Sequence, residues 1–424
     1  MIVYIRQDQD YSNIVTYVLK LLENNCGVQF TFSNKSEEAH LIWDHQNKRS
    51  EPVAVSFYNQ LRFNAKNDEP MPFDPLSGIV DFEGHKDAIA SIFYMMNCIQ
   101  EWNASPQDFD AIGRYKYEAS FQFKHGLITQ NLVQHEMDAL YAKWNIKPLK
   151  EKSVFFLSHD IDTLYGSFLQ DGFWAVKNLK PLVVLRLLFM ELIRRPHWRN
   201  MDRIIRLHDQ YDVRSTFFWL VNRGKDESGI MNADYNIVKE KELMELVVES
   251  GNVNGLHKSC SPMSIDSELI KGDFNSGFNR YHFLNFRAHS DWKKIENSSL
   301  SFDASLGFAE HFGFRNSYGK AFQPYDVEQD KPFNFIEAPL HFMDGTFQKY
   351  MHYPVEKISD AIIELYNRNP YNCDFSVLWH NTFFTDYKYG EYLAQYKRLL
   401  EFIYEEKIPC LVPEEIITKS KIQW

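Results

Sequence analysis

Short apolar runs rich in β-branched and aromatic residues recur at long intervals from residue 153 onward, with helix-like segments between them. This alternation predicts parallel strands joined by helical crossovers, because a parallel connection must cross back over the sheet. About seven or eight such units suit a closed or nearly closed (β/α) barrel. The runs are Val154–Leu157, Ser215–Leu220, Val253–Leu256, Tyr281–Phe286, Leu300–Phe302, Phe333–Ile336, Phe375–Trp379 and Cys410–Val412.

The first 150 residues alternate shorter strand-like runs with helical patterns, which predicts a smaller α/β domain of unknown function at 1–150 ahead of the barrel at 151–424. The polar stretch Asn145–Lys152, which contains Pro148, is the predicted boundary. Two helices are expected, one over Ile14–Leu22 and one capped by Asp87 that runs to about Trp102. Strands are expected at Ile2–Ile5, Val28–Phe32, Leu41–Trp43 and Val53–Phe57.

The net charge, the cysteines and the N-terminal residues indicate which partners and which cell compartment to expect. The formal net charge of -11 disfavours nonspecific nucleic-acid binding, which needs a basic surface, so no nucleic-acid partner is expected. The five cysteines are scattered and form no C-x-x-C pair, as in a cytosolic protein with reduced thiols. The N-terminus lacks the basic and apolar segments of a signal peptide. Together these features predict a cytoplasmic protein.

The most apolar stretch of the chain is Leu179–Ile193, which is interrupted by Lys180, Pro181, Arg186 and Glu191. It is too short and too charged to span a bilayer, so no integral membrane segment is expected. We predict a helix packed on the domain. The alternative is an amphipathic helix that lies on a membrane or a partner, so peripheral membrane contact stays open.

Polar residues that can bind metals or carry protons stand at the ends of several predicted strands. Active sites of (β/α) barrels lie at the C-terminal ends of the strands, so these residues are expected to converge on one pocket. Arg280 and His282 stand at the start of the fourth run, before Arg287 and His289. Those that follow the other runs are His159, Asp160, Asp162, His257, Asp303, His380 and Asn381.

Asp160 and Asp162 are two residues apart just after a buried strand, so both can point into one cleft. One carboxylate can bind a divalent metal while the other removes a proton from water. On spacing alone a solvated turn or a helix N-cap is equally compatible. His257 favours the metal site over these alternatives, because histidine with carboxylate is a common catalytic metal set.

His380 could donate a proton to a departing amine, with Asn381 orienting it or stabilising an oxyanion. The alternative is a structural histidine that is hydrogen-bonded to backbone.

Residues 153–412 resemble the polysaccharide deacetylases of the NodB-homology type, also called carbohydrate esterase family 4. Ser158–Asp162 resembles the first family motif, Gly255–His257 the start of the second, and Leu378–His380 the last. Leu207–Phe218 resembles the helix and strand that follow the first motif. A bacterial two-domain subgroup is the more specific match, through Arg280–Leu284, Asp303–Ala309, Gly313–Arg315, Tyr325–Asp326, His341–Asp344 and Trp379–Asn381.

The resemblance implies a role for each residue. Asp160 would be the base, held ionised and oriented by Arg280, and His380 would be the acid. Asp162 and His257 would bind a divalent metal, expected to be Zn²⁺. The family's second metal-binding histidine, four residues after the first, is replaced here by Ser261. His282 is the expected third ligand, with His289 as the second choice.

The implied function is metal-dependent removal of an N-acetyl group from a carbohydrate, with a cytoplasmic glycan precursor as the substrate. Two alternatives stay open. Ser261 is compatible with a deacetylase-like protein that binds or scaffolds without catalysis. The same base, acid and metal would also serve an amidohydrolase acting on a non-sugar amide.

Overall fold

The computed structural model describes residues 1–67, 80–82, 85–226, 229–422 and 424. Its largest sheet has eight strands in the order β13–β10–β9–β8–β7–β6–β15–β14, and every pairing in it is parallel. The predicted α/β class is confirmed. The strands are β6 (Val154–Ile161), β7 (Ser215–Trp219), β8 (Val253–Lys258), β9 (Phe278–Tyr281), β10 (Phe302–Asp303), β13 (Ile336–Glu337), β14 (Phe342–Met343) and β15 (Asp374–Leu378).

A short segment connects the two edge strands of this sheet. The two edge strands β13 and β14 are joined by residues 338–341 alone, a link that spans at most about 18 Å. On one side Ala338 N donates to Asp303 O at 2.8 Å, and Leu340 N donates to Leu306 O at 2.9 Å. On the other side His341 N donates to Ser376 O at 3.2 Å. The link therefore bridges both edges, and the predicted nearly closed barrel is confirmed.

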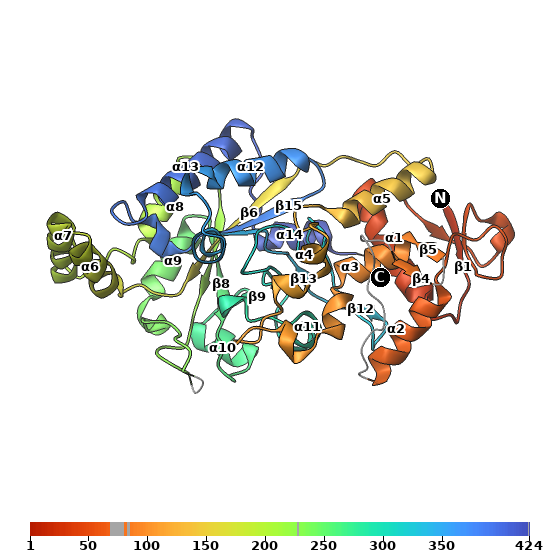
Figure 1. Ribbon diagram of the computed structural model, residues 1–424, viewed down its shortest axis with the longest axis horizontal. Coiled ribbons are helices and arrows are strands. Elements are labelled where there is room, and N and C mark those ends of the chain that lie inside the picture. Colours follow the sequence, from red (N-terminus) through yellow and green to blue (C-terminus); the bar gives the residue numbers. More distant parts are fainter. Residues whose placement is uncertain (68–79, 83–84, 227–228, 423) are drawn as a thin grey trace.

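Helices follow the strands and pack outside the barrel (Figure 1). Their apolar stripes explain the packing, as in α13, which buries Tyr392, Tyr396, Leu399 and Ile403 at helical spacing. These helices are α8 (Met201–Asp209), α9 (Lys241–Glu249), α10 (Ile265–Gly272), α11 (Ala288–Glu296), α12 (Ile358–Arg368), α13 (Gly390–Glu405) and α14 (Pro413–Ser420).

The N-terminal part contains a small parallel sheet in the order β2–β1–β3, with β1 at Ile2–Ile5, β2 at Thr31–Phe32 and β3 at Leu41–Trp43. The Asp87 side chain accepts a hydrogen bond from Ala90 N at 2.9 Å and caps α3 (Ala88–Met96), as predicted, but this helix ends before Trp102. The other α-helices and strands described in this part are α1 (Ser12–Cys26), α2 (Val55–Asn67), α4 (Phe121–Lys124), α5 (Leu132–Lys143) and the antiparallel pair of β4 (Val80–Phe82) and β5 (His85–Asp87).

The N-terminal part and the barrel share one hydrophobic core, which includes residues from both sides of position 150. Tyr17 donates from its hydroxyl to Gln323 O at 2.5 Å. A buried ion pair joins Arg315 of the barrel to Glu101 at 2.8 Å. The two parts are therefore packed together rather than tethered by a linker.

Three predicted strands have another structure or another position, and three more overlap the observed strands β2, β10 and β13 only at their C-terminal ends. Val53–Phe57 contains the start of helix α2, because Phe57, Leu61 and Ala65 are buried at helical spacing and this packing overrides the β-propensity of the valines. Cys410–Val412 forms only an isolated bridge, between Phe155 and Cys410. The strand expected at 281–286 lies at Phe278–Tyr281 instead.

The end of β9 has a backbone cause. A 3₁₀ turn at His282–Leu284 follows it, in which Phe283 and Leu284 have φ of 59° and 54°. This left-handed conformation is unfavourable for residues with a Cβ and cannot continue a strand. The shift in register places Arg280 inside β9 and His282 directly after its C-terminal end, rather than at the start of the strand.

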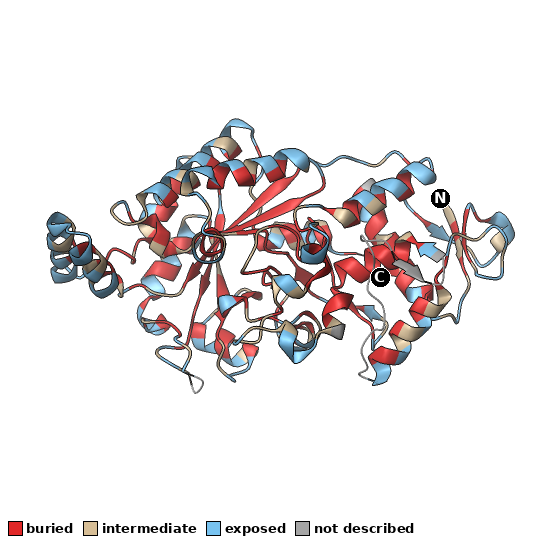
Figure 2. Cartoon of the chain, in the orientation of Figure 1, coloured by how far each residue is buried: buried red, intermediate tan, exposed pale blue. Residues whose placement is uncertain are grey.

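Helices α6 (Ser167–Lys177) and α7 (Pro181–Leu192) form a hairpin that projects from the barrel at the left of Figure 1. Most of its residues are exposed (Figure 2). Within α7 the one buried residue is Leu187. The prediction that this segment packs on the domain is therefore wrong. Across the residues that the structure describes, no helix is long and apolar enough to cross a bilayer.

Candidate active site

Strand β6 sends alternate side chains to opposite faces, and this divides the predicted first motif into two parts. Ser158 and Asp160 face Arg280 inside the barrel. His159 faces the helices, where its Nδ1 donates to Trp379 O at 2.7 Å and its ring stacks on His208. Burial lowers the pKa of His159 to about 4. His159 is therefore a neutral packing residue, and the carboxylates of this motif remain as candidate catalytic groups.

Asp160 is held by Arg280 in the barrel interior, where their side chains are 4% and 0% exposed. Arg280 Nη1 donates to Asp160 Oδ1 at 3.0 Å and to Ser158 Oγ at 2.8 Å. Its Nε donates to Ala304 O at 2.9 Å, and its guanidinium lies over the Phe218 ring. These contacts fix the rotamer of the arginine and, through it, the orientation of the carboxylate.

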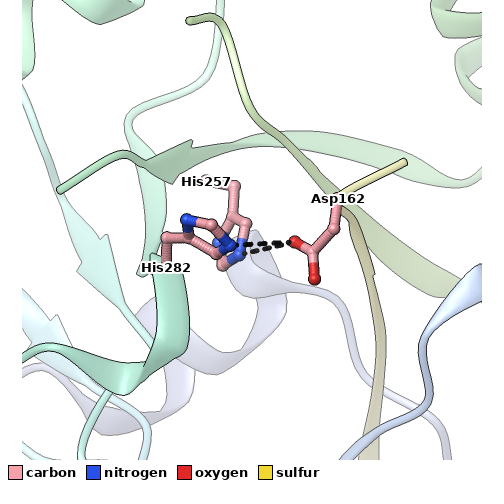
Figure 3. A group of neighbouring side chains, drawn as sticks. All are labelled: Asp162, His257 and His282. Carbon is pink, nitrogen blue, oxygen red and sulfur yellow. Dashed lines mark ion pairs between the residues drawn. The ribbon is translucent and has the colours of Figure 1, made fainter. Parts of the chain in front are cut away.

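Asp162, His257 and His282 form a compact cluster of possible metal ligands (Figure 3). One ligand atom from each lies within 4.8 Å of the others. Asp162 Oδ1 is 3.3 Å from His257 Nε2 and 3.6 Å from His282 Nε2. Two imidazoles with one carboxylate are a donor set of catalytic zinc sites, in which a further position stays open.

The hydrogen bonds and charges around the cluster suit a cation. Burial lowers the pKa of His257, but the carboxylates of Asp160 and Asp162 raise it by more, so a cation would replace a proton between them. His257 donates from Nδ1 to Arg280 O at 2.9 Å, so in its neutral form Nε2 carries the lone pair that faces Asp162. Burial lowers the pKa of His282 to about 4. Burial opposes ionisation of Asp162, but the nearby His282, His257 and His380 outweigh it and hold its pKa well below the usual range. Asp162 Oδ1 is buried and has no hydrogen-bond partner in the described chain, which is an unsatisfied acceptor at the centre of the cluster.

The structure distinguishes the alternatives for the third ligand. His289 donates from Nε2 to Cys98 O at 3.1 Å and packs on Trp102, away from the cluster, so it was the wrong second choice. Ser261 Oγ is also turned away, because it contacts Ser259 and Glu268 at 2.8 and 3.2 Å. The 3₁₀ turn after β9 directs His282 to the cluster instead.

His380 has a partner that the sequence reasoning missed. Its Nδ1 donates to Asp344 Oδ1 at 2.7 Å, and its backbone N donates to Asp344 Oδ2 at 2.6 Å. Burial lowers the pKa of His380, but the charge and hydrogen bond of Asp344 have the larger, opposite effect and raise the pKa to about 9. His380 Nε2 lies 3.7 Å from Asp162 Oδ2. The imidazole is therefore cationic at neutral pH and faces the cluster.

Asp344 could have been found from its position. It directly follows β14, so it obeys the same strand-end rule as the residues that were predicted. Asn381, which was expected to orient His380 or to stabilise an oxyanion, binds backbone instead. Its Nδ2 donates to Thr163 O at 2.8 Å and to Trp198 O at 2.7 Å.

Two further predicted strand-end residues lie outside the cluster. Arg287 donates to Gly113 O at 3.0 Å in the N-terminal part. Asp303 is buried beside Glu337, and burial raises the pKa of both carboxyls, that of Asp303 to about 6. The side chains of Asp160, Asp162, His257, Arg280, His282 and His380 do come together.

The accessible side of the site is formed by Asp162 and His380, whose side chains are 31% and 20% exposed. The N-terminal part reaches this rim, because Arg114 donates to Phe283 O and to the Tyr350 hydroxyl, both at 3.1 Å. A separate pocket of about 770 Å³ lies beside the site and is lined in part by the segment Lys258–Asp266. None of the six predicted site residues lines that pocket.

A family of unknown function, DUF7033, matches residues 1–147. No curated protein matches the chain. Among solved structures, a putative polysaccharide deacetylase from Mycobacterium smegmatis is 12% identical and covers 65% of this chain and 94% of its own, with a TM-score of 0.39. A polysaccharide deacetylase from Bacillus cereus is 9% identical, covers 62% and 94%, and has a TM-score of 0.32. A CE4-family pseudoenzyme from Bacillus anthracis is 11% identical, covers 65% and 70%, and has a TM-score of 0.29. At these scores, function has to be argued from the site.

Proposed function

We propose that this protein is a metal-dependent deacetylase that hydrolyses the acetamide of an N-acetylated sugar in a glycan precursor. The observation that supports this most is the convergence of three groups on one mouth of the barrel. These are a buried carboxylate fixed by arginine, a histidine–carboxylate cluster, and a histidine–aspartate pair. Amide hydrolysis needs the same three functions, namely a base, an electrophile and an acid. The sugar substrate follows from the motif resemblance.

Asp162, His257 and His282 would hold the cation, and Zn²⁺ is the ion that this donor set favours. A divalent cation supplies Lewis acidity towards a carbonyl oxygen and lowers the pKa of water. The hydrogen bond from His257 Nδ1 to Arg280 O keeps that ring oriented. Arg280 thus contacts both the predicted base, through its side chain, and a predicted ligand, through its backbone.

Asp160 is the proposed base. Arg280 occupies its Oδ1, so Oδ2 remains to accept a proton from the attacking water. That Oδ2 lies 3.5 Å from His257 Nε2, so the proton acceptor stands directly beside the predicted cation position.

His380 is the proposed acid. Its Nδ1 is bound to Asp344, so the proton available for transfer is on Nε2, which faces Asp162. Transfer of this proton to the amide nitrogen lets the C–N bond break and releases the amine. Water supplies the oxygen of the second product, acetate.

The substitution Asp344→Asn tests the acid. His380 must be protonated to donate, so acetate release should fall as pH rises through its pKa of about 9. Asp344→Asn removes the charge that raises this pKa, so the alkaline limb of the kcat profile should move to lower pH. The loss in kcat should stay below the roughly 10²–10⁴-fold expected when the acid itself is removed in His380→Ala. An unchanged profile, matching that of the exposed control Asp360→Asn, would refute the pairing.

The cation site can be tested by metal content, without a measurement of activity. Protein purified without chelators is expected to hold about one divalent ion per chain by elemental analysis, and His257→Ala should lose it because one of three ligands is gone. His289→Ala removes a histidine outside the cluster and should retain the ion. Equal metal content in both variants would contradict the assigned ligands.

Ser261 favours a second candidate, a non-catalytic deacetylase-like protein. The side chain at this position forms hydrogen bonds with Ser259 and Glu268, so it supplies no ligand to the cation site. A panel of N-acetylated sugars, sugar nucleotides and cyclic amides separates the candidates. Acetate released from sugars supports the deacetylase, and turnover of cyclic amides alone supports an amidohydrolase. A metal-loaded protein that turns over none of them supports the non-catalytic candidate.

A further inference from the structure

The hairpin of α6 and α7 has the reverse of the usual polarity, with its large apolar side chains directed to solvent. Helix α6 buries Ser167, Asp171 and Ala175, while α7 buries Leu187. Contiguous exposed apolar surface of this kind marks an interaction site. Its main members, hereafter the hairpin surface, are between 59% and 88% exposed: Leu169, Phe173, Leu179, Leu182, Phe189 and Leu192.

The hairpin surface is ordered rather than scattered. Leu169, Phe173 and Val176 follow the i, i+4, i+7 spacing of one helix face. Leu182, Leu185, Phe189 and Leu192 follow the matching spacing on α7. A concave apolar site of about 600 Å³ lies between the two helices near their connection, lined mainly by residues 175–185. Both helices therefore present one shared apolar face.

The charge of the hairpin indicates which kind of partner binds the hairpin surface. The exposed charged residues of the hairpin and the turn that follows it are five basic and one acidic, although the whole chain has a net charge of -11. Apolar faces bordered by Lys and Arg bind the interface of anionic bilayers, where each basic residue adds to the attraction. The basic residues are Lys177, Lys180, Arg186, Arg194 and Arg195, and the acidic one is Glu191. Arg186 also forms an ion pair with Asp386 of the barrel at 2.9 Å, so the argument rests on the other four basic residues.

The base of the hairpin is fixed to the barrel. The buried Asp171 carboxylate accepts from Trp198 Nε1 at 3.0 Å, from the Tyr387 hydroxyl at 2.6 Å and from Lys388 Nζ at 2.8 Å. Asn381 is next to the proposed acid. Its side chain donates to the backbone oxygens of Thr163, before the hairpin, and of Trp198, after it. The hairpin is thus a rigid projection from the rim of the site, and α6 begins five residues after Asp162.

We propose that the α6–α7 hairpin docks the protein on an anionic lipid bilayer. The apolar face inserts at the boundary between headgroups and acyl chains, and the flanking lysines and arginines contact the anionic headgroups. Because the hairpin arises at the rim of the barrel mouth, docking sets the predicted active site beside the membrane surface. The docking itself requires neither a bound cation nor catalysis.

The test is co-sedimentation of the full chain with vesicles of phosphatidylcholine and phosphatidylglycerol, compared with vesicles of phosphatidylcholine alone. The wild type is expected to bind the anionic vesicles more tightly, and added salt should weaken that binding. Leu182→Glu with Phe189→Glu should reduce partitioning by about a hundredfold, roughly tenfold for each apolar side chain. Lys177→Gln with Arg194→Gln should reduce it by about twenty-five-fold on the anionic vesicles only, roughly fivefold for each charge.

A matched control is available on the barrel. Ile270 is 80% exposed, like Leu182, and Val248 is 59% exposed, like Phe189, but neither lies on the hairpin. Ile270→Glu with Val248→Glu should leave vesicle binding unchanged. Equal binding by the hairpin double variant and the wild type, or no binding by the wild type, would overturn the proposal. A third outcome would also overturn it: a wild type that binds no vesicles and forms a dimer in sedimentation equilibrium, with the dimer lost in the hairpin double variant. The hairpin surface would then bind a second copy of the chain. These outcomes do not depend on acetate release, so they are distinct from a failure of the proposed function.

Discussion

Asp160→Asn is expected to lower acetate release by about 10²–10⁴-fold, the usual contribution of a positioned general base. The amide keeps the shape of the carboxylate and can still accept from Arg280, but it cannot take a proton from water. Metal content should be unchanged, because Asp160 is outside the three-residue cluster. Steady-state kinetics and elemental analysis of the same preparation measure both quantities.

Two controls sharpen this result. Asp162→Asn should lose the ion as well as activity, because it removes the carboxylate of the cluster. The exposed Asp202→Asn should match the wild type in both respects. Full acetate release by Asp160→Asn would exclude Asp160 as the base.

Arg280→Met is expected to lower the free energy of unfolding by about 3–5 kcal/mol, the cost of leaving one charge of a buried pair without its partner. Arg280 is fully buried and the side chain of Asp160 is 4% exposed, so water cannot replace the lost guanidinium. Urea denaturation followed by circular dichroism measures the change.

The double variant Arg280→Met with Asp160→Asn isolates the cause. It removes both charges, so it should recover most of the lost stability. Arg206→Met breaks an exposed pair with Asp202 and should cost about 1 kcal/mol or less. If the double variant were as unstable as the sum of the single variants, the loss would come from packing against Phe218 rather than from the unpaired carboxylate.

Much of the barrel could be predicted because its signals are local. Strands β6, β7, β8 and β15 are short apolar runs that helical segments separate, so alternation along the chain was enough to find them. The strand-end rule then brought Asp160, Asp162, His257 and His380 to one mouth without knowledge of any distance.

The failures concern segments whose conformation depends on contacts distant in sequence. Nothing within 281–286 indicates that Phe283 and Leu284 adopt left-handed backbone and end the strand early. The start of α2 was assigned to a strand because its β-branched residues were weighed without the surface they pack on. The segment Leu179–Ile193 was expected to pack on the domain, because apolar composition is the same for a packed helix and for an exposed one.

The amino-acid sequence by itself predicted an α/β barrel and placed Asp160, Asp162, His257 and His380 among the residues at its strand ends, because strand periodicity and strand-end placement are local properties. Only the tertiary structure decided between His282 and His289, joined Asp344 to His380, and turned the hairpin outward. Each of these depends on which distant segments meet, and a residue's local pattern carries no information about its partner across the barrel.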